Sequence, residues 1–360
     1  MASILLAFLT LVIWTHEVFA WGNLGHEAIA DAAQPHLSPD AAKAIAQILG
    51  QGTSLAPHAL ANASTWPDQV RDLQRLGVTA SKLAAAEVKE ALDFNKAFPD
   101  NAEWHFVYMP LGSAHYPDDA QLDDLLSTFT NPNDIVQMLN ICVKILETTG
   151  DVVPWTKAQA LRWLIHLVGD VHQPLHVTAG YYKTAHQHLP NPVLIEHPRE
   201  ASQPGVLGDR GGNELLFNGS ENNNLHALWD SCLVKALAGM RACGKTAEPG
   251  DVGKLSQLIA HRMTLPASAG YHSSGDYYSW GAHWATDSIK TAHTSKAYVF
   301  VRRHGVLQDT HQSEASIRMT IEGPPSRTEY STSQEPVVAV QLTKAAVRLA
   351  DLLNHISWKP

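Results

Sequence analysis

The segment Arg162–His176 constrains the fold of this chain more than any other part of the sequence. Its letters are Arg-Trp-Leu-Ile-His-Leu-Val-Gly-Asp-Val-His-Gln-Pro-Leu-His, so His166 and Asp170 stand four residues apart in an apolar stretch. An α-helix places residues at this spacing on one face, where both can hold the same cation. Pro174 stops that helix, and the following turn can bring His176 round as a further ligand.

The same spacing occurs a second time in the chain. Asn224-Leu-His-Ala-Leu-Trp-Asp places His226 and Asp230 four residues apart at the start of another apolar helix. A single pair of this kind is more often a hydrogen-bonded core pair than a metal site. Two pairs make coincidence a poorer explanation, and His and Asp are ligands that suit zinc. His172 points away from the His166 side, so we expect it behind the ligands or at the surface.

Composition supports bound cations. The 360 residues include 20 His, and 26 Lys plus Arg against 35 Asp plus Glu give a net charge of −9. This balance argues against binding of duplex nucleic acid through a basic surface. Three cysteines are too few for a disulfide scaffold or a thiolate zinc module.

The first twenty residues are typical of a targeting segment. An apolar run over Ile4–Trp14 is too short to span a bilayer, and Val18 and Ala20 stand where a signal peptidase reads small residues. A buried N-terminal helix is the alternative. We predict a cleaved signal peptide over residues 1–20, a mature chain that starts at Trp21, and a secreted or periplasmic protein without stable membrane association. In an exported chain we expect Cys232 and Cys243 to form a disulfide, and Cys142 to be a buried free thiol.

The mature chain has mainly helical periodicity, which favours one α-helical domain over residues 21–360. The expected helices are His26–Ala33, Ser38–Leu49, Ser81–Phe98, Asp134–Thr148, Thr156–Val171, Asn224–Leu237 and Val338–Ile356. Two short extended segments, Trp104–Met109 and Asn213–Phe217, could pair as a small β ribbon. The proline-rich stretch after Val177 is the least regular, and we predict a long inserted loop over residues 178–208.

Three more segments supply groups that could join the two His–Asp pairs. Trp21-Gly-Asn-Leu-Gly-His26 places a free α-amino group near a histidine, and Ser64-Thr-Trp-Pro-Asp68 places a carboxylate at a helix start. Trp104-His105-Phe106-Val107-Tyr108 places a histidine among aromatic residues. Taken singly, Asp68 could be an ordinary residue of a helix N-terminus and His105 a half-buried strand histidine.

These motifs together resemble one family, the zinc-dependent single-strand-specific nucleases and 3′-nucleotidases of the S-one/P-one type, which includes plant bifunctional nucleases. The resemblance runs from Trp21 through Asp209-Arg-Gly-Gly-Asn213 to the last helix. It implies the helical fold that this family shares with zinc-dependent phospholipases C. It also implies three zinc ions. The first would be held by Asp68, His105, His166 and Asp170, and the second by His26, the α-amino and carbonyl groups of Trp21, and Asp170, which bridges the two ions. The third would be held by His176, His226 and Asp230.

The resemblance further implies catalytic and substrate-binding residues. Asp68, Arg71 and Asp170 would serve the chemistry, which is cleavage of the P–O3′ bond to leave 5′-phosphates, and Arg71 stands where the fungal members have a lysine. Phe106 matches the position on which an unpaired base stacks, although a core phenylalanine is the competing interpretation. Tyr108 replaces an aspartate that reads the base edge, so base preference should be weak, and Asn213 is expected to contact substrate.

The predicted protein is thus a secreted, monomeric zinc nuclease whose partners are single-stranded nucleic acid and 3′-nucleotides. A phospholipase C or broader phosphodiesterase with the same metals is one alternative, although no clear membrane-binding face is evident. A secreted zinc-binding protein without activity is another. Asp170 argues against it, because a storage site does not need one carboxylate shared by two cations.

Overall fold

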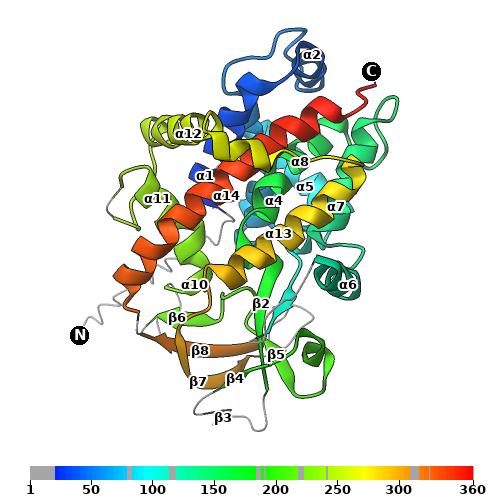
Figure 1. Cartoon of the computed structure of the whole chain (residues 1–360). Coiled ribbons are helices and arrows are strands. Elements are labelled where there is room, and N and C mark those ends of the chain that lie inside the picture. Colours follow the sequence, from blue (N-terminus) through cyan, green and yellow to red (C-terminus); the bar gives the residue numbers. More distant parts are fainter. Residues whose placement is uncertain are drawn as a thin grey trace, which may run out of the picture.

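The computed structural model describes residues 21–78, 83–112, 119–183, 188–189, 192–217, 223–240, 242–308, 316–323 and 325–359. The predicted signal peptide, residues 1–20, lies outside this part. The described chain is mainly α-helical, with one small sheet at the lower end of the helical body in Figure 1. The predicted fold class is therefore confirmed. Among the described residues, no helix is both long and apolar enough to cross a bilayer.

Helix α8 (Lys157–Val171) forms the centre of the helical body, and almost every one of its residues is buried. A helix that is apolar on all sides needs neighbours on all sides. Its first turn is fixed by a capping box, in which Thr156 accepts from the Gln159 N–H and Gln159 returns a contact to Thr156 N. The helices around it are α1 (Gly22–Ala33), α3 (Ala59–Ser64), α4 (Trp66–Leu76), α7 (Ile135–Leu146), α13 (Trp280–Thr294) and α14 (Arg327–His355).

Further helices lie around this centre. They are α2 (Pro39–Ile48), α5 (Ala85–Ala97), α6 (Asp119–Phe129), α9 (Pro174–Val177) and α12 (Pro249–Met263). The predicted helix over residues 224–237 is not uniform, because α10 (Leu225–Ala227) and α11 (Val234–Leu237) flank a π-helical turn over Leu228–Leu233. Helices α6, α12 and α13 are not predicted from the sequence, since glycine, serine and threonine interrupt their apolar pattern.

The last helix is longer than predicted. Helix α14 begins at Arg327 behind a capping box of Ser326 and Glu329, and it continues through Pro336. Proline lacks the N–H that an interior helical position normally uses, and so it usually marks a boundary. Tertiary packing keeps the first turns helical, because Tyr330 is buried and its hydroxyl bonds to both the Trp229 indole N–H and the Ala297 carbonyl.

Eight strands form the described part of the sheet. They are β1 (Met109–Leu111), β2 (Thr178–Lys183), β3 (His188–Leu189), β4 (Val193–Leu194), β5 (Val206–Gly208), β6 (Leu215–Phe217), β7 (Val301–Gln308) and β8 (Ser316–Glu322). Their order is β1-β2-β5-β8-β7-β3, with β4 also paired to β2 and β6 to β8.

The predicted ribbon between residues 104–109 and 213–217 is wrong. Strand β1 pairs in parallel with β2, and β6 pairs in parallel with β8. Trp104 and His105 instead end a 3₁₀-helix over Asn101–His105. The pairing partners were not visible in the sequence, because strands this short carry too little alternation to specify a register.

The segment 178–208 is more regular than the loop we predicted. Its described residues include β2, β4, β5 and a 3₁₀-helix over Pro198–Ser202. Asp209, at its end, is buried and receives hydrogen bonds from the Gly180 N–H, the Gly212 N–H and the Tyr182 hydroxyl. This carboxylate therefore ties the start of the segment to its end, a long-range contact that composition cannot reveal.

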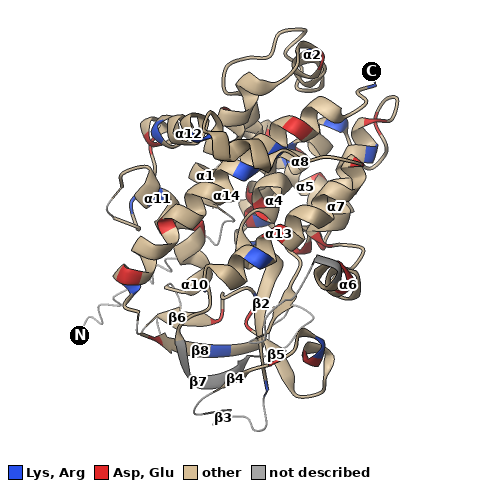
Figure 2. Cartoon of the chain, in the orientation of Figure 1, with Lys and Arg blue, Asp and Glu red and all other residues tan. Residues whose placement is uncertain are grey.

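Two predictions about cysteine are confirmed. Cys232 and Cys243 form a disulfide, and Cys142 is a buried free thiol on α7. Along the described ribbon in Figure 2, Lys and Arg positions (blue) are scattered among Asp and Glu positions (red).

Candidate metal centre

Helices α8 and α9 carry three of the predicted ligands. His166 and Asp170 lie one turn apart on α8, and both are fully buried. Helix α8 ends directly after Asp170, and Gln173 caps α9 by accepting a hydrogen bond from the Leu175 N–H. The turn between the two helices brings His176, also buried, back toward the same region.

The first cluster of candidate ligands contains His105, His166 and Asp170. Asp170 Oδ2 lies 2.9 Å from His105 Nδ1 and 3.1 Å from His166 Nε2, and the two histidine nitrogens are 3.0 Å apart. Asp68 is at the edge of this cluster, with Oδ1 3.7 Å from His166 Nε2. Four side chains that are remote in sequence therefore point toward one small volume.

The second cluster lies on the other side of Asp170. His26 Nε2 is 3.1 Å from Asp170 Oδ1, and the imidazole of His26 stacks on that of His166 with ring centroids 3.9 Å apart. Gly169 makes this approach possible, because a Cβ atom there would lie 2.7 Å from His26 Nδ1. Each oxygen of Asp170 thus faces a different histidine cluster, which is the arrangement required of a carboxylate that bridges two cations.

Trp21 lies beside this second cluster. It is fully buried, and its indole N–H donates a 2.8 Å hydrogen bond to the carbonyl of Gly169, the residue before Asp170. Its carbonyl accepts from the Gly25 N–H at 3.1 Å, and its φ of 37° falls in the left-handed region. The indole therefore fixes Trp21 against the end of α8.

The third cluster contains His176, His226 and Asp230. His226 Nε2 lies 3.1 Å from Asp230 Oδ2 and 3.1 Å from His176 Nε2, and all three side chains are buried. Asp230 Oδ1 lies 4.0 Å from His176 Nε2 and accepts a 2.7 Å hydrogen bond from the amide of Gln173. Gln173 therefore orients Asp230 and caps the helix of His176 at the same time.

Three of the histidines share one orientation, in which Nδ1 lies against a backbone carbonyl. The distances are 2.8 Å from His166 to the Ser64 oxygen, 2.8 Å from His176 to the His105 oxygen, and 2.7 Å from His226 to the Gly211 oxygen. A carbonyl accepts only, so Nδ1 must carry the proton and Nε2 is free to present a lone pair. Backbone carbonyls orient metal-binding histidines in this way.

Several buried polar atoms of these clusters receive no hydrogen bond within the described chain. They are both ring nitrogens of His26, His105 Nε2, Asp68 Oδ2, Asp170 Oδ1 and Asp230 Oδ2. A buried acceptor without a donor costs free energy, and the cost grows for a charged carboxylate. Three groups each have ligand atoms within 4.8 Å of one another, and so have the chemistry of a metal centre: His26, Asp68 and His166; His105, His166 and Asp170; and His176, His226 and Asp230.

Burial and charge shift the pKa values of these groups. Burial lowers the pKa of His105 to about 4, and it also lowers the pKa of His176. Burial acts against the charged form of His166 too, but the Asp170 and Asp68 carboxylates outweigh it and raise its pKa. Burial raises the pKa of Asp170, yet its histidine neighbours hold the net value well below the usual range.

A cluster of aromatic rings supports His105 from behind. The His105 ring lies 5.1 Å from the ring of Trp163, which in turn lies 4.9 Å from Trp104 and 5.9 Å from Phe94. These rings are buried, so they hold the imidazole in place and keep water away from that side.

Arg71 lies on α4, three residues after Asp68. Its Nη1 is 2.9 Å from Asp68 Oδ1, and its Nη2 is 3.6 Å from Asp72 Oδ1. Burial lowers the pKa of Arg71, but these carboxylates raise it to a net value above the usual one. A charged guanidinium thus borders the candidate metal ligands.

Phe106 and Tyr108 lie next to His105 and stack on each other, with ring centroids 4.3 Å apart and planes 13° from parallel. Both residues are half-buried. Phe106 is therefore not the fully buried core residue that the competing interpretation required. Backbone bonds from Val107 N to His176 O and from Ile135 N to Phe106 O hold this segment in place.

The turn Asp209–Asn213 supports the third cluster. Gly211 has φ near 63°, and a Cβ atom there would lie only 2.2 Å from the Leu175 carbonyl oxygen. Its own carbonyl orients His226, as described above. The amide of Asn213 donates to the Arg210 carbonyl at 2.9 Å, so the predicted substrate-binding side chain helps to form this turn.

His172 is not at the surface. It is fully buried, with Nδ1 2.7 Å from the Val168 carbonyl oxygen and Nε2 2.9 Å from the guanidinium Nη1 of Arg348 on α14. Burial and the charge of Arg348 hold its pKa well below the usual range. Sequence reasoning also missed Gln173 and Gly211, although both lie inside motifs that contain predicted ligands.

Comparisons with known proteins agree with this site. The family model described as S1/P1 Nuclease matches residues 21–357. Endonuclease 5 of Arabidopsis thaliana is 23% identical over 359 residues, which cover 99% of this chain and 97% of that protein. Nuclease S1 of Aspergillus oryzae is 25% identical, and the match covers 95% of this chain and 93% of that protein. Nuclease P1 of Penicillium citrinum is also 25% identical, and the match covers 93% of this chain and 97% of that protein.

The match begins at Trp21, the predicted first residue of the mature chain, and it spans all three His and Asp clusters. The family is metal-dependent, and nucleases hydrolyse phosphodiester bonds. Because the family model matches residues 21–357, the chain belongs to the S1/P1 nuclease family.

Proposed function

We propose that this protein is a secreted endonuclease that hydrolyses single-stranded DNA and RNA to 5′-phosphorylated products and also removes phosphate from 3′-nucleotides. The observation that supports this most directly is the position of Asp170. Its two oxygens face His26 on one side and His105 with His166 on the other.

Three zinc ions fit the clusters. Asp68, His105, His166 and Asp170 would hold the first ion; His26, Asp170 and the α-amino and carbonyl groups of Trp21 would hold the second; and His176, His226 and Asp230 would hold the third. The lone pairs of His166, His176 and His226 support this assignment, because their Nδ1 atoms are already used. Bound zinc would supply a water of lowered pKa and would polarise the phosphoryl oxygens.

The chain itself would position the substrate. Arg71 can donate two parallel hydrogen bonds to a phosphate, because a guanidinium presents its donors in a planar fork. Its contact with Asp68 keeps it charged and aimed at the ligands. The ion pair also limits how far the side chain can move, so the phosphate would meet a preorganised cation.

Preference for single strands would come from the stacked pair Phe106 and Tyr108. A base inside a duplex is already stacked on its neighbours, whereas an unpaired base can stack on an exposed aromatic face. Tyr108 offers no carboxylate to a base edge, so we expect weak base preference. Residues 1–20 would direct export, and their removal would free the Trp21 α-amino group.

The test compares substrates directly. The chain starting at Trp21 is assayed on single-stranded DNA, single-stranded RNA, duplex DNA, a 3′-mononucleotide and a choline phospholipid, each with and without a chelator. We expect chelator-sensitive hydrolysis of the two single strands and of the 3′-mononucleotide, with 5′-phosphate ends. Release of a phosphate ester from the phospholipid without nucleotide cleavage would favour a phospholipase instead. If none of the substrates is hydrolysed, the proposed enzymatic activity is refuted.

A further inference from the structure

The segment that carries two candidate ligands of the third cluster is not a regular α-helix. Helix α10 ends at Ala227, one residue after His226, and a π-helical turn over Leu228–Leu233 contains both Asp230 and Cys232. Such a turn makes i→i+5 hydrogen bonds, which an uninterrupted α-helix does not use, and it occurs frequently at functional sites. The position of Asp230 therefore depends on a backbone conformation that ordinary α-helical bonding does not enforce.

One side of this turn borders a large pocket. The pocket has a volume of about 940 Å³ and is enclosed by α1, α11, the first turn of α12, and the segments 57–62 and 243–249. Four residues of the turn line it: Leu228, Asp230, Ser231 and Cys232. On the other side of the turn, Trp229 is fully buried, and its indole N–H donates a 2.8 Å hydrogen bond to Tyr330 on α14. Packing therefore holds the turn on the side of Trp229, whereas the pocket leaves space into which the opposite side can move.

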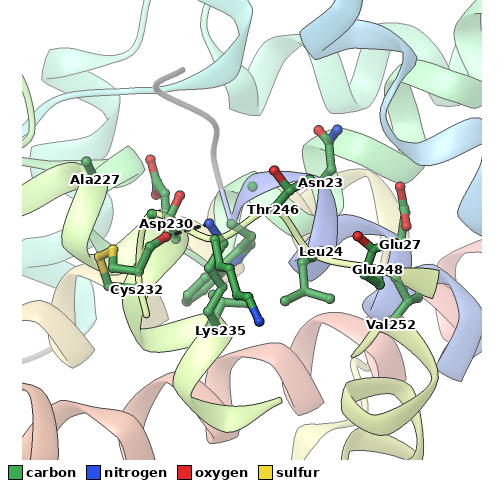
Figure 3. Close-up of a pocket in the computed structure, with 18 of the residues that line it drawn as sticks. Asn23, Leu24, Glu27, Ala227, Asp230, Cys232, Lys235, Thr246, Glu248 and Val252 are labelled. Atoms are coloured by element: carbon green, nitrogen blue, oxygen red, sulfur yellow. Dashed lines mark hydrogen bonds between the residues drawn. A yellow bond between two sulfur atoms is a disulfide. The ribbon is translucent and has the colours of Figure 1, made fainter. Parts of the chain in front are cut away.

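The Cys232–Cys243 disulfide ties down this opposite side. Cys232 lies in the turn, and Cys243 begins the segment 243–249, which forms a wall of the pocket. The Cys243 carbonyl also accepts a 2.7 Å hydrogen bond from Lys235 on α11. Figure 3 shows the disulfide beside Asp230 at one side of the pocket. The disulfide is thus a covalent tether between the turn and the segment next to it.

Asp230 needs an accurate orientation, because its two oxygens serve different partners. Oδ2 lies 3.1 Å from His226 Nε2 and, although buried, receives no hydrogen bond within the described chain. Oδ1 accepts a 2.7 Å hydrogen bond from Gln173 and lies 4.0 Å from His176 Nε2. A metal site requires ligand distances that are correct within about 0.2 Å. A small movement of the turn would therefore impair this site long before it unfolded the helices.

We propose that Cys232 and Cys243 are positioning residues of the third metal site. Their disulfide holds the π-helical turn in the conformation that presents Asp230 to the same volume as His176 and His226. Without the bond, the turn relaxes toward the pocket and Asp230 loses its orientation, so the third ion binds more weakly in a protein that is still folded. This role rests on the three-zinc centre of the proposed function and adds to it a residue pair that is not itself a ligand.

The test measures zinc affinity rather than activity. The zinc-loaded chain that starts at Trp21 is titrated with a chelator of known affinity, and the zinc that stays bound is measured. We expect three ions in the parent protein. Cys232→Ser/Cys243→Ser should hold two of them with unchanged affinity and the third about 10- to 100-fold more weakly, the usual effect of losing a contact that supports a ligand. Circular dichroism would verify that the variant is folded.

The matched control is Cys142→Ala. It creates a cavity at a buried position of α7, and so it destabilises the fold while the disulfide stays intact. We expect it to hold all three ions as the parent protein does. A disulfide with a purely structural role would instead lower the thermal stability of the serine variant without changing the affinity for the third ion.

A second measurement does not require the chain to fold without the disulfide. A water-soluble trialkylphosphine is added to the folded, zinc-loaded protein, in which Cys232 and Cys243 line the pocket and Cys142 is buried. The phosphine takes one oxygen from water and becomes its oxide, and the disulfide is reduced to two thiols. We expect release of one zinc per chain, recorded with an indicator dye. The phosphine oxide, which cannot reduce a disulfide, is the control.

The Asp230→Asn background shows whether the disulfide acts through Asp230. Adding Cys232→Ser/Cys243→Ser to Asp230→Asn should not weaken zinc binding further. Equal affinity for the third ion in the folded serine variant and the parent protein, equal weakening of all three ions, or no zinc release on complete reduction would overturn the positioning role. A parent protein that binds fewer than three ions would refute the three-zinc assignment, and the positioning role with it. Three bound ions without hydrolysis of any substrate would refute only the proposed activity.

Discussion

At the scale of single residues, Asp170 is a buried carboxylate among several histidines. It is fully buried, and its two oxygens contact His26, His105 and His166. Two cations that share one carboxylate each depend on its charge. The corresponding amide keeps the shape of the side chain and removes that charge.

Asp170→Asn should therefore reduce turnover by about a thousandfold or more, because the metal-activated nucleophile is lost. It should also lower the zinc content of the purified protein. Turnover on a 3′-mononucleotide and metal content by elemental analysis would measure both effects. Full zinc content with normal turnover would rule out a shared carboxylate.

Gln173 has a different role, since it contacts Asp230 and the Leu175 N–H but no candidate metal position. Gln173→Glu retains an acceptor for Leu175 and removes the donor to Asp230. We expect metal affinity at the third cluster to fall about 10- to 100-fold, as is usual when a supporting hydrogen bond is lost, while two ions stay bound. Titration with zinc would measure this. Gln137→Glu, on α7, is the control, and equal affinity in both variants would contradict the role of Gln173.

The half-buried stacked pair of Phe106 and Tyr108 can be tested by changing one ring. Phe106→Ala should weaken the binding of a single-stranded oligonucleotide by about 1–3 kcal/mol, the usual contribution of one base–aromatic stack. Phe106→Tyr keeps the ring and should bind normally, whereas Phe106→Leu should resemble the alanine variant. Fluorescence anisotropy with chelated enzyme would give these affinities, and a normal affinity of Phe106→Ala would return Phe106 to a structural role.

At the scale of elements, α13 and α14 fix the end of α8 that carries Asp170. Asp287 on α13 accepts hydrogen bonds from Lys344 at 2.8 Å and Arg348 at 2.9 Å, both on α14. Arg348 continues to His172, directly after α8, and Gln341 donates to the His172 carbonyl at 2.9 Å. Charged groups on two neighbouring helices thus support the end of the helix that carries His166 and Asp170.

Asp287→Asn should lower the free energy of unfolding at pH 7 by about 1–2 kcal/mol, because it leaves the half-buried Lys344 and Arg348 without their carboxylate. Burial raises the pKa of Asp287, but these cations lower it below the ordinary 3.8. Because the pKa of Asp287 is lower in the folded protein than in the unfolded chain, its ionised form stabilises the fold at pH values above the unfolded pKa. That stabilisation is lost as the pH falls through the pKa of the folded state. Urea unfolding from pH 7 to below 3.8 should show the two proteins converging only at the acid end; a pH-independent difference would contradict the ion-pair explanation.

At the scale of the whole molecule, Trp21 would link the removal of residues 1–20 to the candidate metal centre. The residue is buried against Gly169, and it lies beside His26 and Asp170. A free α-amino group has a pKa of about 7.7–8.0, so a cation can displace its proton. A peptide nitrogen has its lone pair delocalised into the amide and is a poor ligand.

One glycine added before Trp21 should therefore remove one zinc and most of the activity without unfolding the helices. A glycine added after Pro360 is the control. Zinc stoichiometry, turnover and circular dichroism would be measured on both proteins and on the chain that starts at Trp21. Equal stoichiometry and turnover in all three would exclude the α-amino group as a ligand.

Much of the helical part could be predicted from the sequence, because its signals are local. The apolar spacing and caps of α7 and α8 lie within the helices themselves, and the four-residue spacing alone places His166 and Asp170 on one face. The two His–Asp pairs, the position of Trp21 and the cysteine pair are likewise visible as motifs. Their chemistry follows from residue type and spacing, which do not depend on the rest of the fold.

Contacts between distant segments were decided only by the tertiary structure. No local pattern states that β1 pairs with β2, that Pro336 lies inside α14, or that Arg348 meets a buried His172. The pocket beside Asp230 likewise forms only where α1, α11 and α12 meet. Such features depend on which surfaces pack together, and packing minimises the free energy of the whole chain rather than that of any one segment. The sequence by itself therefore determined which residues are candidate ligands and where the central helices lie, and the tertiary structure decided the mutual orientation of these residues and the shape of the space around them.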